Sequence, residues 1–263
     1  MDRELNIRPR YYRWHVDPGV SWEEKNTDYA YLDWRVPLSQ SALVLVDVWE
    51  EHYLKEPAQR ADAIVEARIV PLLAACREAG LRLIHAPAPG LAEHHPAWVR
   101  LIDDPSKPAG SGESWPPRDF RSKSGAYAAY ARPEEPREPE IVEMRSRRRM
   151  HPLVHVGDGE VVIYNGEELH RYCERERILF LFFLGFNTNA CILLRDYGTI
   201  EMSKRGYEVI ILRDCGTGME SFESQDGLWQ TRGAILFLEM FGKYSVTSTE
   251  MIEALQTVGP QDS

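Results

Sequence analysis

The chain has 263 residues, of which 43% are hydrophobic and 27% charged, the balance of an ordinary globular protein with one large or two small α/β domains. Its 31 Lys and Arg residues against 41 Asp and Glu residues give a net charge of −10. That charge argues against partners such as nucleic acid or a membrane surface, since either would require a basic face.

The sequence also indicates a compartment. No apolar run is long enough to span a bilayer, and the N-terminal stretch MDRELNIRPRYY has no apolar segment of the signal-peptide kind. The four cysteines show no C-x-x-C spacing. We therefore expect a cytoplasmic protein with free thiols rather than a disulfide framework.

The first 40 residues are rich in aromatic side chains and arginine but show no helix or strand periodicity. Too many large aromatics are present for a solvated tail. We interpret residues 1–40 as an ordered arm that lies over the body of the protein or over a neighbouring subunit.

Strands and helices then alternate. An apolar strand over 42–46 ends at Asp47, a helix over 59–79 is closed by Gly80, and a second strand covers 81–86. Pro71 would kink that helix or mark an internal start. The next stretch, about 87–140, is rich in Pro, Gly, Ser and charge, which predicts an irregular insertion near the functional site.

The second half continues the alternation, which predicts a parallel sheet with right-handed crossovers in one domain over 41–257. A capping box of Thr247 and Glu250 begins the last helix. The other elements expected are short strands at 141–144 and 160–164, a helix over 167–175, a strand over 178–184, a helix that begins near Cys191 and ends at Gly206, a strand from 207, a helix over 224–241 and a strand over 244–247.

Two reactive side chains follow apolar strands, Asp47 after the first and Cys191 after the strand over 178–184. Because the carboxyl ends of parallel strands meet at one rim, both should lie there. A thiol at a helix N-terminus is favoured as thiolate, and an aspartate beside it can act as its general base. The alternatives are a cysteine packed like a small hydrophobe and an aspartate that caps a helix or belongs to a turn.

Four segments in this order resemble the isochorismatase-like cysteine hydrolases, a family that includes nicotinamidases and N-carbamoylsarcosine and ureidoacrylate amidohydrolases. They are LVLVDVWEEHY, the turn GFNTNAC with Gly185, Thr188 and Cys191, the segment GTIEMSKRGYEVIILRD, and the ending FGKYSVTSTEMIEAL. The resemblance spans residues 41–255.

The resemblance implies an α/β three-layer sandwich around a six-stranded parallel sheet, doubly wound, and an Asp–Lys–Cys triad. Cys191 would be the nucleophile and Asp47 the residue that activates it. A cis peptide would fall at Phe186–Asn187 or Asn187–Thr188, and backbone N–H groups of the turn at Asn187 and Thr188 would form the oxyanion hole.

The sequence departs from the family pattern at the lysine of that triad. Tyr164 and Asn165 stand where the lysine and its loop would belong. Lys55 and Lys123 are possible replacement cations. Other cationic side chains that could stand beside the thiolate are Arg145, Arg147, Arg148, Arg149, His151 and His155.

The leading hypothesis is a hydrolase of the C–N bond of a small amide or ureide, with Trp49 and Tyr53 lining the substrate pocket. No cofactor is expected, and no metal, because the histidines lack a tight ligand spacing. A divergent protein of the same fold that binds ligands or assembles without hydrolysis is the alternative. Ether hydrolysis of the isochorismatase type, without a nucleophilic cysteine, is a third. The resemblance also implies a homodimer or homotetramer.

Overall fold

The computed structural model describes residues 3–102, 116–133 and 135–259. The chain divides into two compact units. The larger comprises Met1–Leu101 and Arg149–Ser263, and the smaller is Ile102–Arg148. The part of the expected insertion that covers 103–115 lies outside the described residues.

The larger unit is built on an eight-stranded sheet in the order β3-β2-β10-β9-β8-β5-β6-β7. The six strands from β10 to β7 are parallel, which confirms the predicted α/β sheet, and β2 and β3 extend it with antiparallel pairing. The strands of this sheet are β2 (Arg10–Arg13), β3 (Asp28–Tyr31), β5 (Ser41–Val46), β6 (Arg82–Ala86), β7 (Val161–Val162), β8 (Phe180–Phe186), β9 (Glu208–Thr217) and β10 (Tyr244–Val246).

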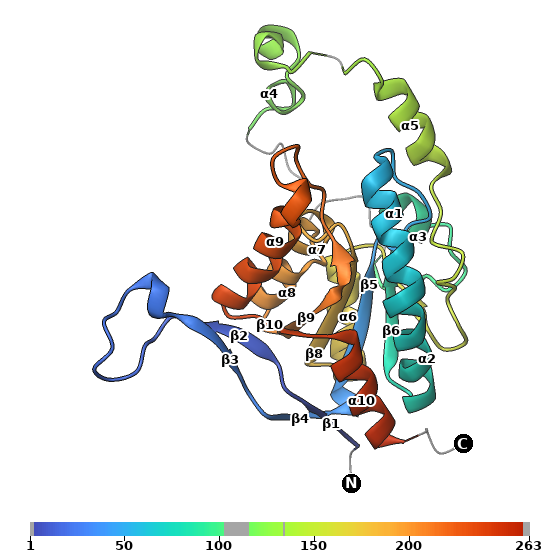
Figure 1. Ribbon diagram of the computed structural model, residues 1–263. Helices are drawn as coiled ribbons and strands as arrows, with labels where there is room; N and C mark the ends of the chain where they lie inside the picture. The colour runs from blue at the N-terminus through green and yellow to red at the C-terminus, as the bar shows by residue number, and fades with distance from the viewer. Residues whose placement is uncertain (1–2, 103–115, 134, 260–263) are drawn as a thin grey trace. The chain divides into compact units, whose positions relative to one another are not determined.

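Helices cover both faces of this sheet (Figure 1). On one face, alternate strand residues such as Leu43 and Leu45 pack with α1 (Lys55–Ile64), α2 (Val70–Ala79) and α10 (Ser248–Val258). On the other, Val44 and its neighbours pack with α6 (Gly166–Glu176), α7 (Cys191–Leu194), α8 (Thr199–Lys204) and α9 (Trp229–Met240). The two-residue period of a strand divides the core between these two layers. A short helix, α3 (Pro89–Ala92), follows β6.

The helix predicted over 59–79 is divided. A π-helical turn, Val65–Ile69, separates α1 from α2, and Pro71 lies in the first turn of α2. The backbone stays helical across both boundaries, since Val65, Ile69 and Val70 all have right-handed helical dihedral angles. Proline cannot donate to the turn before it, and the π-helical turn directly before Pro71 is the local irregularity that accompanies this missing bond. Pro71 therefore lies beside a local irregularity in one continuous helical path rather than at a new start, and Gly80 ends α2 with a φ of 72°.

Two sequence expectations are wrong. Residues 141–144 form no strand but belong to α5 (Glu138–Arg147) in the smaller unit, where acidic residues in the first turn and arginines in the last complement the helix dipole. The single helix expected from Cys191 to Gly206 is broken into α7 and α8. Gly198 precedes α8, and a Cβ there would stand 2.8 Å from the Ile192 carbonyl oxygen. The smaller unit also contains α4 (Arg118–Ser122).

The N-terminal arm is folded into strands. β1 (Glu4–Ile7) pairs with β4 (Trp34–Pro37), and Leu5 and Ile7 are buried in the core. The hairpin of β2 and β3 projects from the β10 edge of the sheet (Figure 1). Cross-strand pairing and burial thus order this segment. In β1, Leu5 and Ile7 alternate with exposed polar residues, so the expectation that the arm lacks strand periodicity is wrong there.

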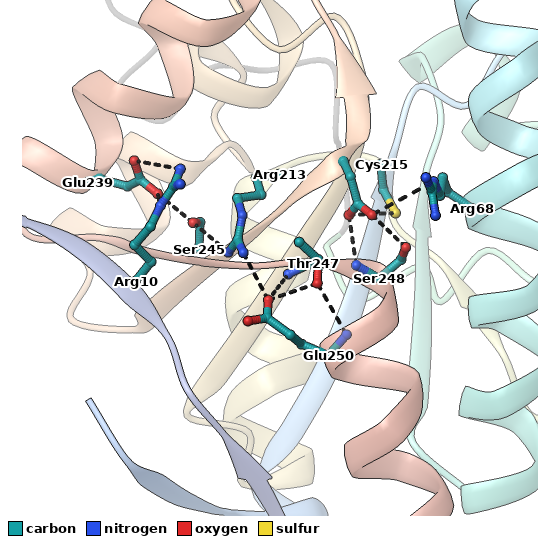
Figure 2. Close-up of polar contacts among 10 residues, drawn as sticks. Arg10, Arg68, Arg213, Cys215, Glu239, Ser245, Thr247, Ser248 and Glu250 are labelled. Carbon is teal, nitrogen blue, oxygen red and sulfur yellow. Dashed lines mark hydrogen bonds and ion pairs between the residues drawn. The ribbon is translucent and has the colours of Figure 1, made fainter. Parts of the chain in front are cut away.

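A polar network joins the arm to the body (Figure 2). Arg10 of β2 donates to Glu239 of α9 at 2.8 Å, and Glu239 also accepts from Ser245 of β10. Arg213 of β9 donates to Ser245 at 3.2 Å and to Glu250 of α10 at 3.0 Å. The buried carboxylate of Glu239 is therefore paired and hydrogen-bonded, as a buried charge must be.

A second set of hydrogen bonds joins β9 to the start of the last helix, α10. Asp214 accepts from the backbone N–H and the hydroxyl of Ser248, both at 2.7 Å. The predicted capping box is confirmed, because Thr247 and Glu250 exchange hydrogen bonds at the start of α10. No helix in the described part of the chain is both long enough and apolar enough to cross a membrane.

Candidate active site

Asp47 and the Cys191 turn follow the carboxyl ends of adjacent parallel strands, β5 and β8. Val46 pairs with Gly185 in the register of these strands. Gly185 has a φ of 125°, and a Cβ at this position would stand 1.9 Å from the Val46 carbonyl oxygen. Only glycine permits both the conformation and the approach. This contact brings the segments that carry Asp47 and Cys191 together.

The turn after β8 contains the expected cis peptide bond, at Phe186–Asn187. The Asn187 carbonyl accepts from the N–H groups of Ala190 and Ile192, at 3.0 and 3.2 Å. The N–H of the buried Thr188 donates to the Thr217 carbonyl at 3.0 Å, so it is already used to hold the turn against β9. The backbone amide of Asn187, by contrast, lies near enough to the Cys191 sulfur to lower its pKa.

Cys191 begins α7 and is half-buried, with its thiol within the electrostatic reach of the Asp47 carboxylate. Burial raises the pKa of Cys191 to about 11, and the negative charge of Asp47 adds to the rise, while Arg195 and the Asn187 amide act in the opposite direction. The expectation of a resting thiolate is therefore wrong. α7 has only four residues, so its dipole cannot outweigh burial and a neighbouring carboxylate.

Arg195 is a site residue that the sequence analysis missed. It directly follows α7, its N–H donates to the Cys191 carbonyl at 3.2 Å, and its Nη2 lies 3.4 Å from Asp47 Oδ2. The Asp47 side chain is 3% exposed and that of Arg195 36%. The available signal was the i,i+4 spacing of Cys191 and Arg195, which places two side chains on one face of a helical turn.

The segment where the resemblance placed a lysine carries a different arrangement. The buried carboxylate of Glu168 accepts from the Trp98 indole at 2.8 Å, from the Tyr164 backbone at 2.8 Å and from the Leu101 backbone at 2.9 Å. Three N–H donors satisfy this carboxylate. Tyr164 and Asn165 thus belong to a structural connection between β7 and α6.

The other proposed site residues lie in several environments. Trp49 is buried, with its ring 5.1 Å from that of Phe186, whereas Tyr53 is exposed and stacks on His52. Lys55 is exposed at the start of α1. Lys123 belongs to the smaller unit, where its Nζ lies 3.5 Å from the ring centre of Phe120.

The histidines and arginines considered as alternative cations also lie in different parts of the structure. His151 is buried, with its Nε2 3.4 Å from Asp62, and the His155 carbonyl accepts from Arg77. Arg145 and Arg147 lie on α5 of the smaller unit. Among the residues that the structure describes, no three His, Cys, Asp or Glu side chains gather into a group that could hold a metal ion.

Comparisons with known proteins assign the class. The model of the isochorismatase domain matches residues 41–240, and the chain therefore belongs to the isochorismatase family. A cysteine hydrolase from Pseudomonas syringae pv. phaseolicola 1448A superposes with a TM-score of 0.57 at 16% identity, over 86% of this chain and 96% of that one. An isochorismatase family protein from Desulfovibrio vulgaris subsp. vulgaris str. Hildenborough superposes with a TM-score of 0.50 at 18% identity, over 82% of this chain and 98% of that one.

These structural similarities establish the fold, and the family membership supports a hydrolase of this superfamily. No curated protein sequence matches the chain.

Proposed function

We propose that this protein hydrolyses the C–N bond of a small amide or ureide, with Cys191 as nucleophile and Asp47 as general base. The observation that carries the proposal is that Cys191 and Asp47 follow the carboxyl ends of adjacent parallel strands, close enough for the negative charge of Asp47 to raise the pKa of the Cys191 thiol. A nucleophile and base within hydrogen-bond reach are the minimal apparatus of covalent acyl transfer.

The raised pKa of Cys191 favours general-base attack over attack by a preformed thiolate. As Sγ bonds to the substrate carbonyl carbon, the thiol proton passes to Asp47. The tetrahedral intermediate then expels the amine, which takes that proton from Asp47. The acyl group stays on Cys191 as a thioester if the substrate is an amide, or as an S-thiocarbamate if it is a ureide. Water attacks this acyl-enzyme and gives its proton to Asp47, and the departing sulfur recovers a proton from the same carboxyl group. Of the two residues expected to form the oxyanion hole, Thr188 has its N–H bonded to Thr217, so the N–H of Asn187 would hold the oxyanion.

The test is ammonia or amine release by the full-length protein across a panel of small amides and ureides. Cys191→Ser and Asp47→Asn should each lower kcat by at least about a thousand-fold, in line with other nucleophile and base deletions. Cys173→Ser, which removes a buried thiol of α6, should leave the rate within about two-fold. An active Cys191→Ser enzyme would contradict the proposal. A thioester adduct on Cys191, seen by mass spectrometry after rapid quench, would support it directly.

One observation favours the alternative of a non-hydrolytic ligand-binding or assembly protein, namely the structural role of Tyr164 and Glu168 in place of a lysine site. Saturable binding of a panel compound without any turnover would select that alternative. A cytoplasmic location and a homodimer or homotetramer stay predictions. The four free cysteines support the first, since free thiols persist in a reducing compartment.

A further inference from the structure

We propose that Arg195 supplies the positive charge of this site, and that the short connection between β7 and α6 holds it in position. Arg195 would fix the Asp47 carboxylate and stabilise negative charge as it moves to the Cys191 sulfur. This inference rests on the proposed function, because it assigns a further residue to the same reaction.

The first argument is geometric. Arg195 follows the single turn of α7, so it lies one helical turn after Cys191. Its guanidinium Nη2 lies 3.4 Å from Asp47 Oδ2. The carboxylate is almost fully buried and the arginine about two-thirds so. A cation at this distance and depth acts through less water than a surface pair does, so its effect on a neighbouring charge is larger.

The second argument concerns charge. Before attack, the site contains the Asp47 carboxylate and a neutral thiol, and proton transfer moves the negative charge onto sulfur and then onto the substrate oxygen. Arg195 counteracts the rise in the Cys191 pKa that burial and Asp47 cause. Burial disfavours the charge of the Arg195 guanidinium, but Tyr197, Asp47 and Cys191 together raise the pKa of Arg195. The guanidinium therefore keeps its charge while the anion moves.

The third argument is how the arginine is held. The next residue, Asp196, accepts from the Gly166 N–H through its carboxylate at 2.9 Å. A Cβ on Gly166 would stand 2.0 Å from the Asp196 carbonyl oxygen, so only glycine permits this approach. Tyr197 is buried, and its hydroxyl donates to the Pro87 carbonyl at 3.4 Å. The backbone that carries Arg195 is thus fixed by its two following residues.

Gly166 reaches Asp196 because only residues 163–165 connect β7 to α6. Asn165 begins the helix at once, accepting from the Glu168 N–H at 3.0 Å. The part of the sequence that lacks the expected lysine is therefore the part that positions the segment with Arg195.

The test measures the apparent pKa of Cys191 in the full-length protein. Rapid pH-jump mixing with methyl methanethiosulfonate, read out by peptide mass spectrometry, gives the reaction rate at Cys191 from pH 7 to 11.5. Arg195→Gln should raise this pKa by about one unit or more, as expected when an opposite charge is removed from within ~4–6 Å. Arg195→Lys should restore most of the difference. An unchanged pKa in Arg195→Gln, or no restoration by lysine, would overturn the proposal.

Two controls match these variants. Arg205 is 34% exposed and paired with Glu167, almost the exposure of Arg195, so Arg205→Gln should leave the Cys191 pKa unchanged. Gly166→Ala should raise it through displacement of Asp196, whereas Gly233→Ala, with open space on α9, should not. A Gly166→Ala protein that folds with wild-type thiol titration would disprove the positioning role.

The measurement needs no substrate, so the two proposals can fail separately. An unaffected thiol titration in Arg195→Gln, with Cys191→Ser inactive, would remove only the inference about Arg195. Turnover by Cys191→Ser would remove the proposed function, whatever the titration shows. Once a substrate is known, Arg195→Gln should lower kcat more than it raises KM, since the charge is needed as the anion develops.

Discussion

Gly185 of β8 lies so close to Val46 of β5 that a Cβ on the glycine would stand 1.9 Å from the Val46 carbonyl oxygen. Val46 directly precedes Asp47, and Gly185 directly precedes the cis peptide of the Cys191 turn. The close approach of two backbones therefore determines how near the base and the thiol can come.

Gly185→Ala is expected to destabilise the protein severely. The new methyl group cannot coexist with the Val46 carbonyl, and the φ of 125° is strained for any residue with a side chain. We expect a loss of at least ~3 kcal/mol in the free energy of unfolding, or no folded protein, measured by urea denaturation. Gly233→Ala on α9 should cost nothing. Equal stability of the two variants would refute the close contact.

The cysteines should react in a fixed order with iodoacetamide. Cys191 is half-buried with a pKa of about 11, Cys173 is buried with a pKa of about 12, and burial raises the pKa of Cys76 further. Only the thiolate reacts, so Cys191 should label first and about ten-fold faster for each pH unit between 7 and 10. Peptide mass spectrometry gives each rate. Labelling of Cys76 or Cys173 at the rate of Cys191 would mean that the thiol of the site is not the accessible one.

Loss of Arg10 should cost far more than loss of Arg8. Arg10 pairs with Glu239, whose side chain is fully buried, so Arg10→Ala leaves an unpaired buried charge, worth roughly 3–5 kcal/mol. Arg8 pairs with Asp33 at the surface, with 68% and 89% of the side chains exposed, and Arg8→Ala should cost less than about 1 kcal/mol. Urea unfolding of both variants measures the difference. Similar values would show that the arm contributes no buried ion pair.

Stability should fall in acid through Glu160. Burial opposes its charge, but hydrogen bonds from His85 and Arg77, at 2.7 and 2.6 Å, lower its pKa from 4.5 to about 2. A depressed folded-state pKa stabilises the protein above the unfolded value, and this stabilisation is lost as the pH falls from about 4.5 to 2. The shift corresponds to on the order of 3 kcal/mol.

Glu160→Gln should therefore flatten the pH dependence of the unfolding free energy between pH 5 and 2. The exposed Glu56 serves as control, and Glu56→Gln should keep the wild-type slope. A wild-type slope in Glu160→Gln would show that this carboxyl group titrates normally in the folded protein.

Local sequence patterns predicted the parts of the fold that have local causes. The apolar run before Asp47, the capping box of Thr247 and the left-handed Gly80 each follow from a few neighbouring residues. Local patterns failed at two places. The helix expected from Cys191 is interrupted where the chain turns at Gly198 against the carbonyl oxygens of Ile192 and Arg195, and residues 141–144, a short apolar stretch flanked by charge, belong to α5 rather than to a strand.

The sequence by itself determined the alternation of strands and helices, the family resemblance and the two candidates Asp47 and Cys191, because periodicity and residue order are properties of the chain. Tertiary structure alone decided the environment of the thiol. Burial and a carboxylate overcame the short helix α7, and a tight glycine contact between α6 and Asp196 placed Arg195 beside them. The interaction between charges depends on the distance between them and on how deeply they are buried, and neither can be read from spacing along the chain.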